Sequence, residues 1–334
     1  MMDRRFLASL SQFTIYRDES MTGPDFIGIG QQKAGTGWLY HQLSNHPDFW
    51  LPPVKELHFF DRGFNFHRAR NRLNAILKMS EPKGTRSWRN RIEMNPDSER
   101  GLLDELEYDL EFYRLALLTK LARRQQRLKK KRGNDDGEFA ESLDSRQLEF
   151  YTSLFSVTNR LTGDITPAYA VLSPKAIQLI SDTFVNTKYI MQIRHPVSRT
   201  ISHIRHYYRN GKFDEQSFAN ADAMAKLLAA YPQFVANSLC STIYENWSAK
   251  LDPNKLLLMS LENIIAHPDE IRQKLAEFLS VDDAGFSIPS DYNSKKNLFK
   301  VDIPGESIEY LEQFFEVEVS RCQDVFEDHC ANWK

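Results

Sequence analysis

The sequence predicts an α/β fold in which a central parallel β-sheet is covered by helices on both faces. Two observations support this fold class. Short apolar segments alternate with amphipathic ones over residues 163–279, which is typical of a parallel sheet. Near the N-terminus, a glycine-containing turn joins an apolar segment directly to a helical one. The 334 residues show no internal repeat and no linker, so we expect a single domain over residues 1–334 with a helical, charged insert at about 62–150.

The first predicted strand is Phe26–Gly30, followed by a turn at residues 31–35 and a helix at 36–44. In that helix Leu39 and Leu43 are spaced four apart, as on one helix face. Residues 163–169 are predicted as a strand end with its loop. The other predicted elements are strands at 187–193 and 256–261, and helices at 102–131, 174–184, 196–210 and 269–279. The helix at 102–131 runs into a basic cluster, which is either a solvated helix end or a docking patch for an acidic acceptor.

The composition is that of an ordinary globular protein, with 41% hydrophobic and 26% charged residues and a net charge of -2. This balance gives no reason to expect nucleic acid as a partner, so an anion site has to be a local patch. No stretch of 18 apolar residues and no long signal-peptide core occur, so we expect a cytoplasmic protein without a membrane span. The three cysteines, Cys240, Cys322 and Cys330, predict free thiols rather than a disulfide framework.

The segment from Gly30 to Trp38 is the first candidate binding site. A loop between a strand and a helix directs backbone N–H groups at a ligand, and the helix N-terminus adds positive partial charge. Lys33 adds a full charge and Thr36 a hydroxyl. A Walker P-loop does not fit, because Lys33 precedes Thr36 by three residues and no Gly-Lys-Thr occurs. The remaining alternative is a turn that only connects strand and helix. The candidate anion-binding residues are Gln32, Lys33, Ala34, Gly35, Thr36, Gly37 and Trp38.

The second candidate begins at Arg194, at the carboxyl end of a predicted strand, where open α/β sheets bind ligands. Ser202 follows eight residues later, about two helical turns on, so both side chains can converge on one anion. Arginine binds phosphate bidentately, and serine adds a hydroxyl donor. Arg199, Arg205 and Arg209 strengthen the positive field. A solvated basic helix face is the alternative interpretation.

Together these two segments resemble the sulfotransferases that use 3′-phosphoadenosine 5′-phosphosulfate (PAPS). Residues 33–36 (Lys-Ala-Gly-Thr) resemble the family's 5′-phosphosulfate loop, and residues 194–202 resemble its 3′-phosphate motif. Residues 55–61 (Lys-Glu-Leu-His-Phe-Phe-Asp) and 163–169 resemble the branch that includes heparan sulfate N- and 3-O-sulfotransferases and their bacterial relatives. Gly37, where the family has a larger residue, and Asp164, where it has Glu, depart from the pattern. The resemblance implies a P-loop-like central parallel β-sheet flanked by helices in a single sulfotransferase domain.

The resemblance also implies roles for individual residues in transfer of a sulfuryl group from PAPS, without a metal ion, to a hydroxyl or amine of a small molecule or carbohydrate. Lys33 would neutralise charge on the bridging oxygen, and Arg194 with Ser202 would hold the 3′-phosphate. Glu56 is the first candidate for the base and His58 the second. An ion pair of Glu56 with Lys55 or Arg62, and a packed histidine, are the alternatives for these two. A loop with Lys295 and Lys296 occupies the place where the family closes over the 3′-phosphate, and a plain solvated loop is the alternative.

Two other functions stay open at this point. A small-molecule kinase would need an acidic Mg²⁺ ligand, for which Asp164 is the candidate, and a non-catalytic nucleotide-binding relative would keep the fold alone. Tyr244 and Trp247 could frame an adenine, although core packing of Trp247 is the simpler interpretation. The insert at 62–150 is expected to shape the acceptor pocket. The acceptor itself and the oligomeric state are not legible from the sequence.

Overall fold

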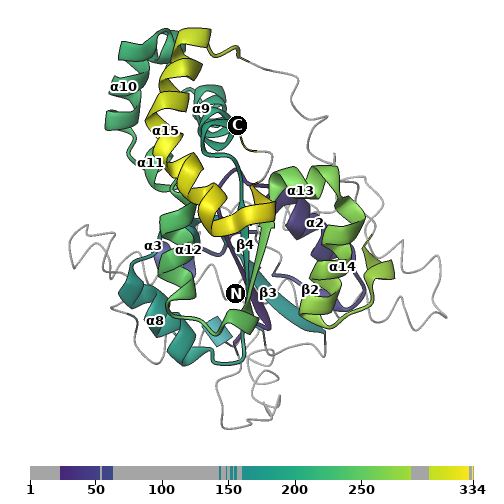
Figure 1. Cartoon of the computed structure of the whole chain (residues 1–334). Coiled ribbons are helices and arrows are strands. Elements are labelled where there is room, and N and C mark those ends of the chain that lie inside the picture. Colours follow the sequence, from purple (N-terminus) through teal and green to yellow (C-terminus); the bar gives the residue numbers. More distant parts are fainter. Residues whose placement is uncertain are drawn as a thin grey trace, which may run out of the picture.

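The computed structural model describes residues 23–52, 55–62, 160–286 and 301–330, with positions 143, 148, 151, 152, 154, 155 and 333. Its centre is a five-stranded sheet with the strand order β2-β3-β1-β4-β5, and each strand pair is parallel (Figure 1). The strands are β1 (Phe26–Gly30), β2 (Phe49–Trp50), β3 (Leu161–Ile165), β4 (Lys188–Ile193) and β5 (Leu256–Ser260). This architecture confirms the predicted fold class.

Helices cover both faces of the sheet, and their cores are distinct. On one face Ile27 and Ile29 of β1 pack against α8 and α12, and on the other Phe26 packs among residues of α2 and α14 (Figure 1). A third apolar cluster joins α9, α10 and α11 to the first half of α15. The helices are α2 (Thr36–Asn45), α3 (Phe59–Arg62), α8 (Pro174–Thr183), α9 (Pro196–Arg209), α10 (Ala221–Ala230), α11 (Gln233–Ala236), α12 (Cys240–Ser248), α13 (Leu261–Ala266), α14 (Pro268–Leu279) and α15 (Gly305–Phe326).

The central strand β1 determines where a site can form. All five of its residues are buried, and β3 and β4 flank it in parallel. The carboxyl ends of these three strands therefore lie at the same edge of the sheet. The chain leaves that edge through the loop at residues 31–35, through Thr166 and through Arg194. Open α/β sheets bind their ligands in this position.

The predicted elements agree with the structure wherever a local pattern was strong. The strands at 26–30, 187–193 and 256–261 are confirmed to within a residue or two, as are the helices at 36–44, 174–184, 196–210 and 269–279. The sequence did not indicate β2, α10 or α13. The insert from 63 to 142, with the predicted helix at 102–131 and its basic cluster, lies outside the described residues. No helix among the described residues is both long and apolar enough to cross a membrane.

Gly163 provides a test of the contact between β1 and β3. It lies beside Phe26 in the strand register, and a Cβ at this position would lie 2.0 Å from Cζ of the Phe26 ring. The ring is fully buried, so we expect Gly163→Ala to lower the free energy of unfolding by about 1–3 kcal/mol, measured by chemical denaturation. Gly305→Ala is the matched control, because a Cβ there has no heavy atom within 4 Å. Equal effects of the two substitutions would contradict this account.

Candidate functional site

The loop between β1 and α2 leaves a helix N-terminus open to a ligand. Gly35 is the N-cap residue of α2, with a φ of 93°, and no side chain caps the helix. A side chain at Gly35 would also meet Leu261, since a Cβ would lie 2.9 Å from Leu261 Cδ1. The N–H of Gln31 donates to the Gln192 carbonyl of β4 at 2.6 Å, which anchors the start of the loop. The Trp38 N–H donates to the Gly35 carbonyl at 2.8 Å, so the amides of Thr36 and Gly37 are the first-turn groups that can bind an anion.

Arg194, in the turn after β4, and Arg199, in the first turns of α9, bind the same loop. Arg194 donates from Nη1 to the Lys33 carbonyl oxygen at 3.2 Å, and Arg199 donates to the Gln32 carbonyl at 3.3 Å. The structure thus brings together the two segments that the sequence analysis singled out. Arg199 is fully buried, and it also donates to Ser238 Oγ and to the Phe234 carbonyl. Arg199 is therefore a buried structural link, so the alternative of a solvated helix face does not hold for this residue.

Positive charge is concentrated around Lys33. Burial, followed by the charges of Arg209, Arg194, Arg199 and Lys55, lowers the pKa of Lys33 from 10.5 to about 8. Burial also lowers the pKa of Arg194, and Glu262 partly opposes that effect. Within the part of the chain that the structure describes, no carboxylate forms an ion pair with Lys33. Such a cluster of like charges is stabilised when an anion binds.

The other predicted binding residues are placed unequally. Gln32, Gly37 and Ser202 are half-buried, and Ser202 lies on α9 without a side-chain hydrogen bond to any described residue. Ala34 and Trp38 are buried, and Trp38 belongs to the apolar core that includes residues of α14. Their N–H groups donate to the carbonyls of Gln31 and Gly35, so neither residue has a free amide for a ligand. Lys295 and Lys296 lie outside the described residues.

The segment with the candidate bases has an unusual backbone. Glu56 and His58 have φ values of 63° and 55°, and Lys33 has 72°. Among the described residues only two further non-glycine positions, Ser280 and Glu327, have positive φ. Such conformations cost about 1–3 kcal/mol each and cluster at functional sites. The three residues predicted as catalytic are therefore all held in strained conformations.

His58 lies between two carboxylates. Its Nδ1 lies 2.8 Å from Asp61 Oδ2, and its Nε2 lies 3.5 Å from Glu56 Oε2. The imidazole is 3% exposed, while Glu56 is half-buried with its other oxygen 3.9 Å from Lys55 Nζ. The hydrogen bond from Nδ1 to Asp61 fixes the orientation of the imidazole ring, and the other ring nitrogen, Nε2, faces Glu56. Both alternatives weighed from the sequence, a packed histidine and a Lys55–Glu56 ion pair, describe real contacts.

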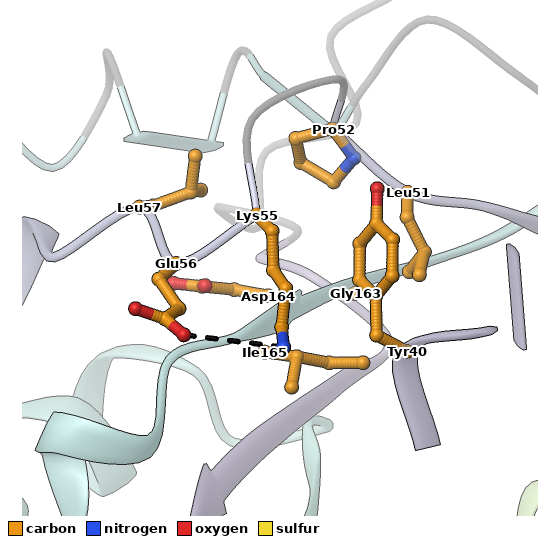
Figure 2. Close-up of a pocket in the computed structure, with 9 residues that line it drawn as sticks. All are labelled: Tyr40, Leu51, Pro52, Lys55, Glu56, Leu57, Gly163, Asp164 and Ile165. Carbon is orange, nitrogen blue, oxygen red and sulfur yellow. Dashed lines mark ion pairs between the residues drawn. The ribbon is translucent and has the colours of Figure 1, made fainter. Parts of the chain in front are cut away.

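A small pocket opens beside Glu56. It encloses about 180 Å³ of empty space, part of it open to solvent. Figure 2 shows Lys55 and Glu56 pointing toward each other on one side of the pocket, with the Tyr40 ring across from them. Lys55 Nζ lies 5.7 Å from the centre of that ring. The lining residues are Tyr40, Leu51, Pro52, Lys55, Glu56, Leu57, Gly163, Asp164 and Ile165.

Asp164 belongs to a buried hydroxyl network rather than to an open site. Its carboxylate accepts hydrogen bonds from Tyr151, Thr166 and Tyr169, and Asp164 is 1% exposed. Burial raises its pKa to about 6. The Tyr169 hydroxyl also accepts from the Phe59 N–H at 2.8 Å, which connects the network to the His58 segment. Asp164 is therefore a buried carboxylate bound by three hydroxyls, unlike the accessible carboxylate that a kinase would need for Mg²⁺.

The structure also bears on Trp247 and on residues that the sequence analysis did not name as site residues. Trp247 is fully buried and donates from Nε1 to the Ala170 carbonyl at 3.2 Å, so core packing is the correct interpretation. Asp61 was missed as a site residue, although its spacing of three from His58 would have indicated the contact. Tyr40 and Tyr169 were also missed, because their roles depend on burial and on distant partners.

A comparison with models of known protein families shows the family of this chain. The model of a family described as the sulfotransferase family matches residues 24–284. The chain belongs to the sulfotransferase family. This match spans β1 to α14 and includes both cation-bearing turns and the Glu56 segment.

Solved structures of sulfotransferases are similar to this chain at low sequence identity. The crystal structure of a sulfotransferase from Alicyclobacillus acidocaldarius is 18% identical, with coverage of 90% of this chain and 95% of that chain, and a TM-score of 0.54. This likeness supports the fold. The sulfotransferase domain from the curacin biosynthetic pathway is 17% identical over 89% of this chain and 98% of that chain, with a TM-score of 0.43. No curated protein sequence matches the chain.

The electrostatic environment of Lys33 predicts its titration. After ¹³C-methylation of the lysines, we expect one NMR resonance to titrate at about pH 8, well below an ordinary lysine at about 10.4. The resonance should be absent from Lys33→Arg and should shift to higher pKa when sulfate is added, because an anion favours the charged form. Titration of Lys33 at the ordinary lysine pKa of about 10.4 would contradict the charge cluster.

Proposed function

We propose that this sulfotransferase takes its sulfuryl group from PAPS and transfers it, by in-line displacement, to a hydroxyl or amine. The observation that carries the proposal is the convergence of Lys33 and Arg194 at the open N-terminus of α2. PAPS has a phosphate at its 3′ position and a phosphosulfate at its 5′ position. The turns after β1 and β4 are both cationic, so each can bind one of these two groups. The Glu56 segment lies close enough for the charge of Lys55 to lower the pKa of Lys33.

The donor half of the site would bind PAPS by its two anionic ends. The α2 amides, with Thr36, would hold the 5′-phosphate, and Lys33 would neutralise the charge that develops on the bridging oxygen. Arg194 and Ser202 would hold the 3′-phosphate, with Lys295 and Lys296 closing over it. A 3′-phosphate anchor lets an enzyme discriminate PAPS from ATP. Gly37 has no side chain, so its contact with the 5′-phosphate would come from its backbone N–H alone.

The acceptor half would remove a proton as the acceptor attacks. Glu56 is our proposed base, because it borders the pocket and its second oxygen is near an imidazole. His58, oriented by Asp61, would stabilise the ionised Glu56 or share the proton. A base within reach of the acceptor and a cation at the leaving group are the two demands of in-line transfer. These groups argue against a non-catalytic relative.

We propose a small molecule or a carbohydrate as the acceptor. The described pocket has Lys55 as its single cationic lining residue, and Lys55 is paired with Glu56. A polyanionic glycan of the heparan sulfate type would need further cations from outside the described residues. We also propose that residues 1–334 form one domain in which the insert at about 62–150 shapes the acceptor pocket. Exchanging that insert should then change acceptor choice and leave PAPS binding intact.

Calorimetry with adenosine 3′,5′-bisphosphate (PAP), the desulfated product, tests the donor assignment. We expect the wild-type protein to bind PAP and Arg194→Ala to lose about 2 kcal/mol or more, because charge-assisted hydrogen bonds contribute about 1.5–3 kcal/mol. Lys33→Ala should lose affinity in the same way. Mg-ATP should bind weakly. A thermal melt of each variant reports whether it is folded.

Lys226→Ala is the matched control, because this exposed lysine on α10 pairs with Asp222 far from the loop. It should bind PAP as the wild type does. Preferential binding of Mg-ATP would replace the proposal with a kinase. Absence of PAP binding by a folded wild-type protein would contradict both the donor and the function.

Glu56→Gln tests the base. We expect the rate of sulfuryl transfer from ³⁵S-labelled PAPS to a panel of phenols, alcohols, amines and sugars to fall about 10²–10⁴-fold. Affinity for PAP should stay unchanged, because Glu56 is placed at the acceptor end. Glu245→Gln, a half-exposed glutamate that pairs with Arg321, is the matched control. Equal transfer rates in Glu56→Gln and the wild type would remove Glu56 as the base.

A further inference from the structure

Cys240 meets two residues of α15, Glu318 and Cys322, in a buried cluster. Cys240 is the first residue of α12, and Glu318 and Cys322 lie four apart on one face of α15. One ligand atom from each residue lies within 4.8 Å of the other two. Both cysteines are 0% exposed, and Glu318 is 8% exposed. We call these three residues the thiol–carboxylate cluster.

The carboxylate of Glu318 is fixed in place. Its Oε1 accepts a hydrogen bond from the Ser241 N–H at 2.8 Å, and its Oε2 accepts from Ser241 Oγ at 3.0 Å. The thiol of Cys322 donates to Oε1 at 3.2 Å. An ionised carboxylate offers about four lone-pair positions, so Glu318 can accept these bonds and still bind a cation. The contacts orient the group as neighbours of metal ligands usually do.

A fourth oxygen lies beside the cluster. Gln31 Oε1 lies 3.5 Å from Cys240 Sγ, and the Gln31 side chain is fully buried. Its amide nitrogen has no hydrogen-bond partner. An unpartnered buried amide costs free energy. The amide oxygen accepts a hydrogen bond from the Cys240 thiol and so already faces the cluster, and loss of that thiol proton on metal binding would leave the oxygen available to the ion.

We propose that Cys240, Glu318 and Cys322 bind one Zn²⁺-class cation, with the Gln31 amide oxygen as the fourth ligand. Thiolates select Zn²⁺ or Cd²⁺ over Mg²⁺ and Ca²⁺. Zn–S bonds of about 2.3 Å and Zn–O bonds of about 2.0–2.2 Å place tetrahedral ligands within about 4 Å of one another. The three donors therefore need to approach by less than about 1 Å. On binding, two S–H bonds break, two metal–sulfur bonds form, and two protons pass to solvent.

The location indicates a structural role. Four protein ligands leave no open position for a substrate, which is typical of structural zinc sites. The ion would join α12 to α15 and both helices to Gln31, the first residue of the loop between β1 and α2. Cys240 Sγ is also 3.5 Å from the Arg194 carbonyl oxygen. Metal binding would therefore stabilise the two cationic turns through Gln31 and the Arg194 backbone. The proposal does not depend on the identity of the sulfuryl donor.

The test uses the full, untagged chain after treatment with a chelator and a thiol reductant. Titration with Cd²⁺ is followed by thiolate-to-metal charge-transfer absorption, and Zn²⁺ is followed by the thermal melting temperature. We expect one equivalent of Cd²⁺ per chain and a higher melting temperature with Zn²⁺. In Cys322→Ser, Cd²⁺ affinity should fall at least about 10-fold, and Zn²⁺ should no longer raise the melting temperature.

Cys330→Ser is the matched control, because Cys330 is equally buried but does not belong to the cluster among the described residues. It should bind Cd²⁺ as the wild type does. Should Cys322→Ser fail to fold, Glu318→Gln gives the same measurement, since glutamine keeps an acceptor for Ser241. No charge-transfer band at one equivalent, an unchanged titration in a folded Glu318→Gln or Cys322→Ser, or a Cys240–Cys322 disulfide in the purified protein would each overturn the proposal.

Discussion

The contact between the guanidinium of Arg194 and the carbonyl of Lys33 is the interaction on which the site depends. It joins the turn after β4 to the turn after β1, and it places two cations where two strands end. The charge of Arg194 also helps to lower the pKa of Lys33. The protein thus stores electrostatic repulsion at this edge of the sheet. A bound anion would relieve that repulsion, so the arrangement of charges favours anion binding at this edge.

The strain at Lys33, Glu56 and His58 has to be offset by the rigid structure around them. The loop at Lys33 is anchored by the bond from Gln31 to β4. The backbone after Glu56 is held by the Phe59 N–H bond to the Tyr169 hydroxyl, and Tyr169 is in turn bonded to Asp164. The buried Asp164 network therefore supports the segment with the candidate base. Residues with strained φ values persist where surrounding hydrogen bonds and packing fix the backbone conformation.

The sequence was sufficient for the parts of the molecule that depend on local patterns. The strand–loop–helix unit at 26–44 and the strand–helix unit at 188–209 follow from apolar periodicity, and both candidate turns lie where those units predict. The sequence could not show that Arg199 is buried, because a charged residue on a helix resembles a solvated one until its partners Ser238 and Phe234 are placed. It also could not show the thiol–carboxylate cluster, because Cys240 precedes Glu318 by 78 residues and Cys322 by 82 residues along the chain. Burial and long-range convergence are tertiary properties.

The two halves of the site have opposite charge, and Lys55 lies between them. Its ammonium group contributes to the lowered pKa of Lys33 and lies 3.9 Å from Glu56. The donor half is cationic, whereas the acceptor half has two carboxylates around His58. A reaction that moves an anionic group needs this gradient, because the leaving group gains negative charge while the attacking group loses a proton. The Lys55 ammonium group interacts with both halves, so its energy depends on the charge of the leaving group and on the protonation of the attacking group. In the proposed function, Lys55 would therefore lie between the cationic turns and the base, in electrostatic contact with both.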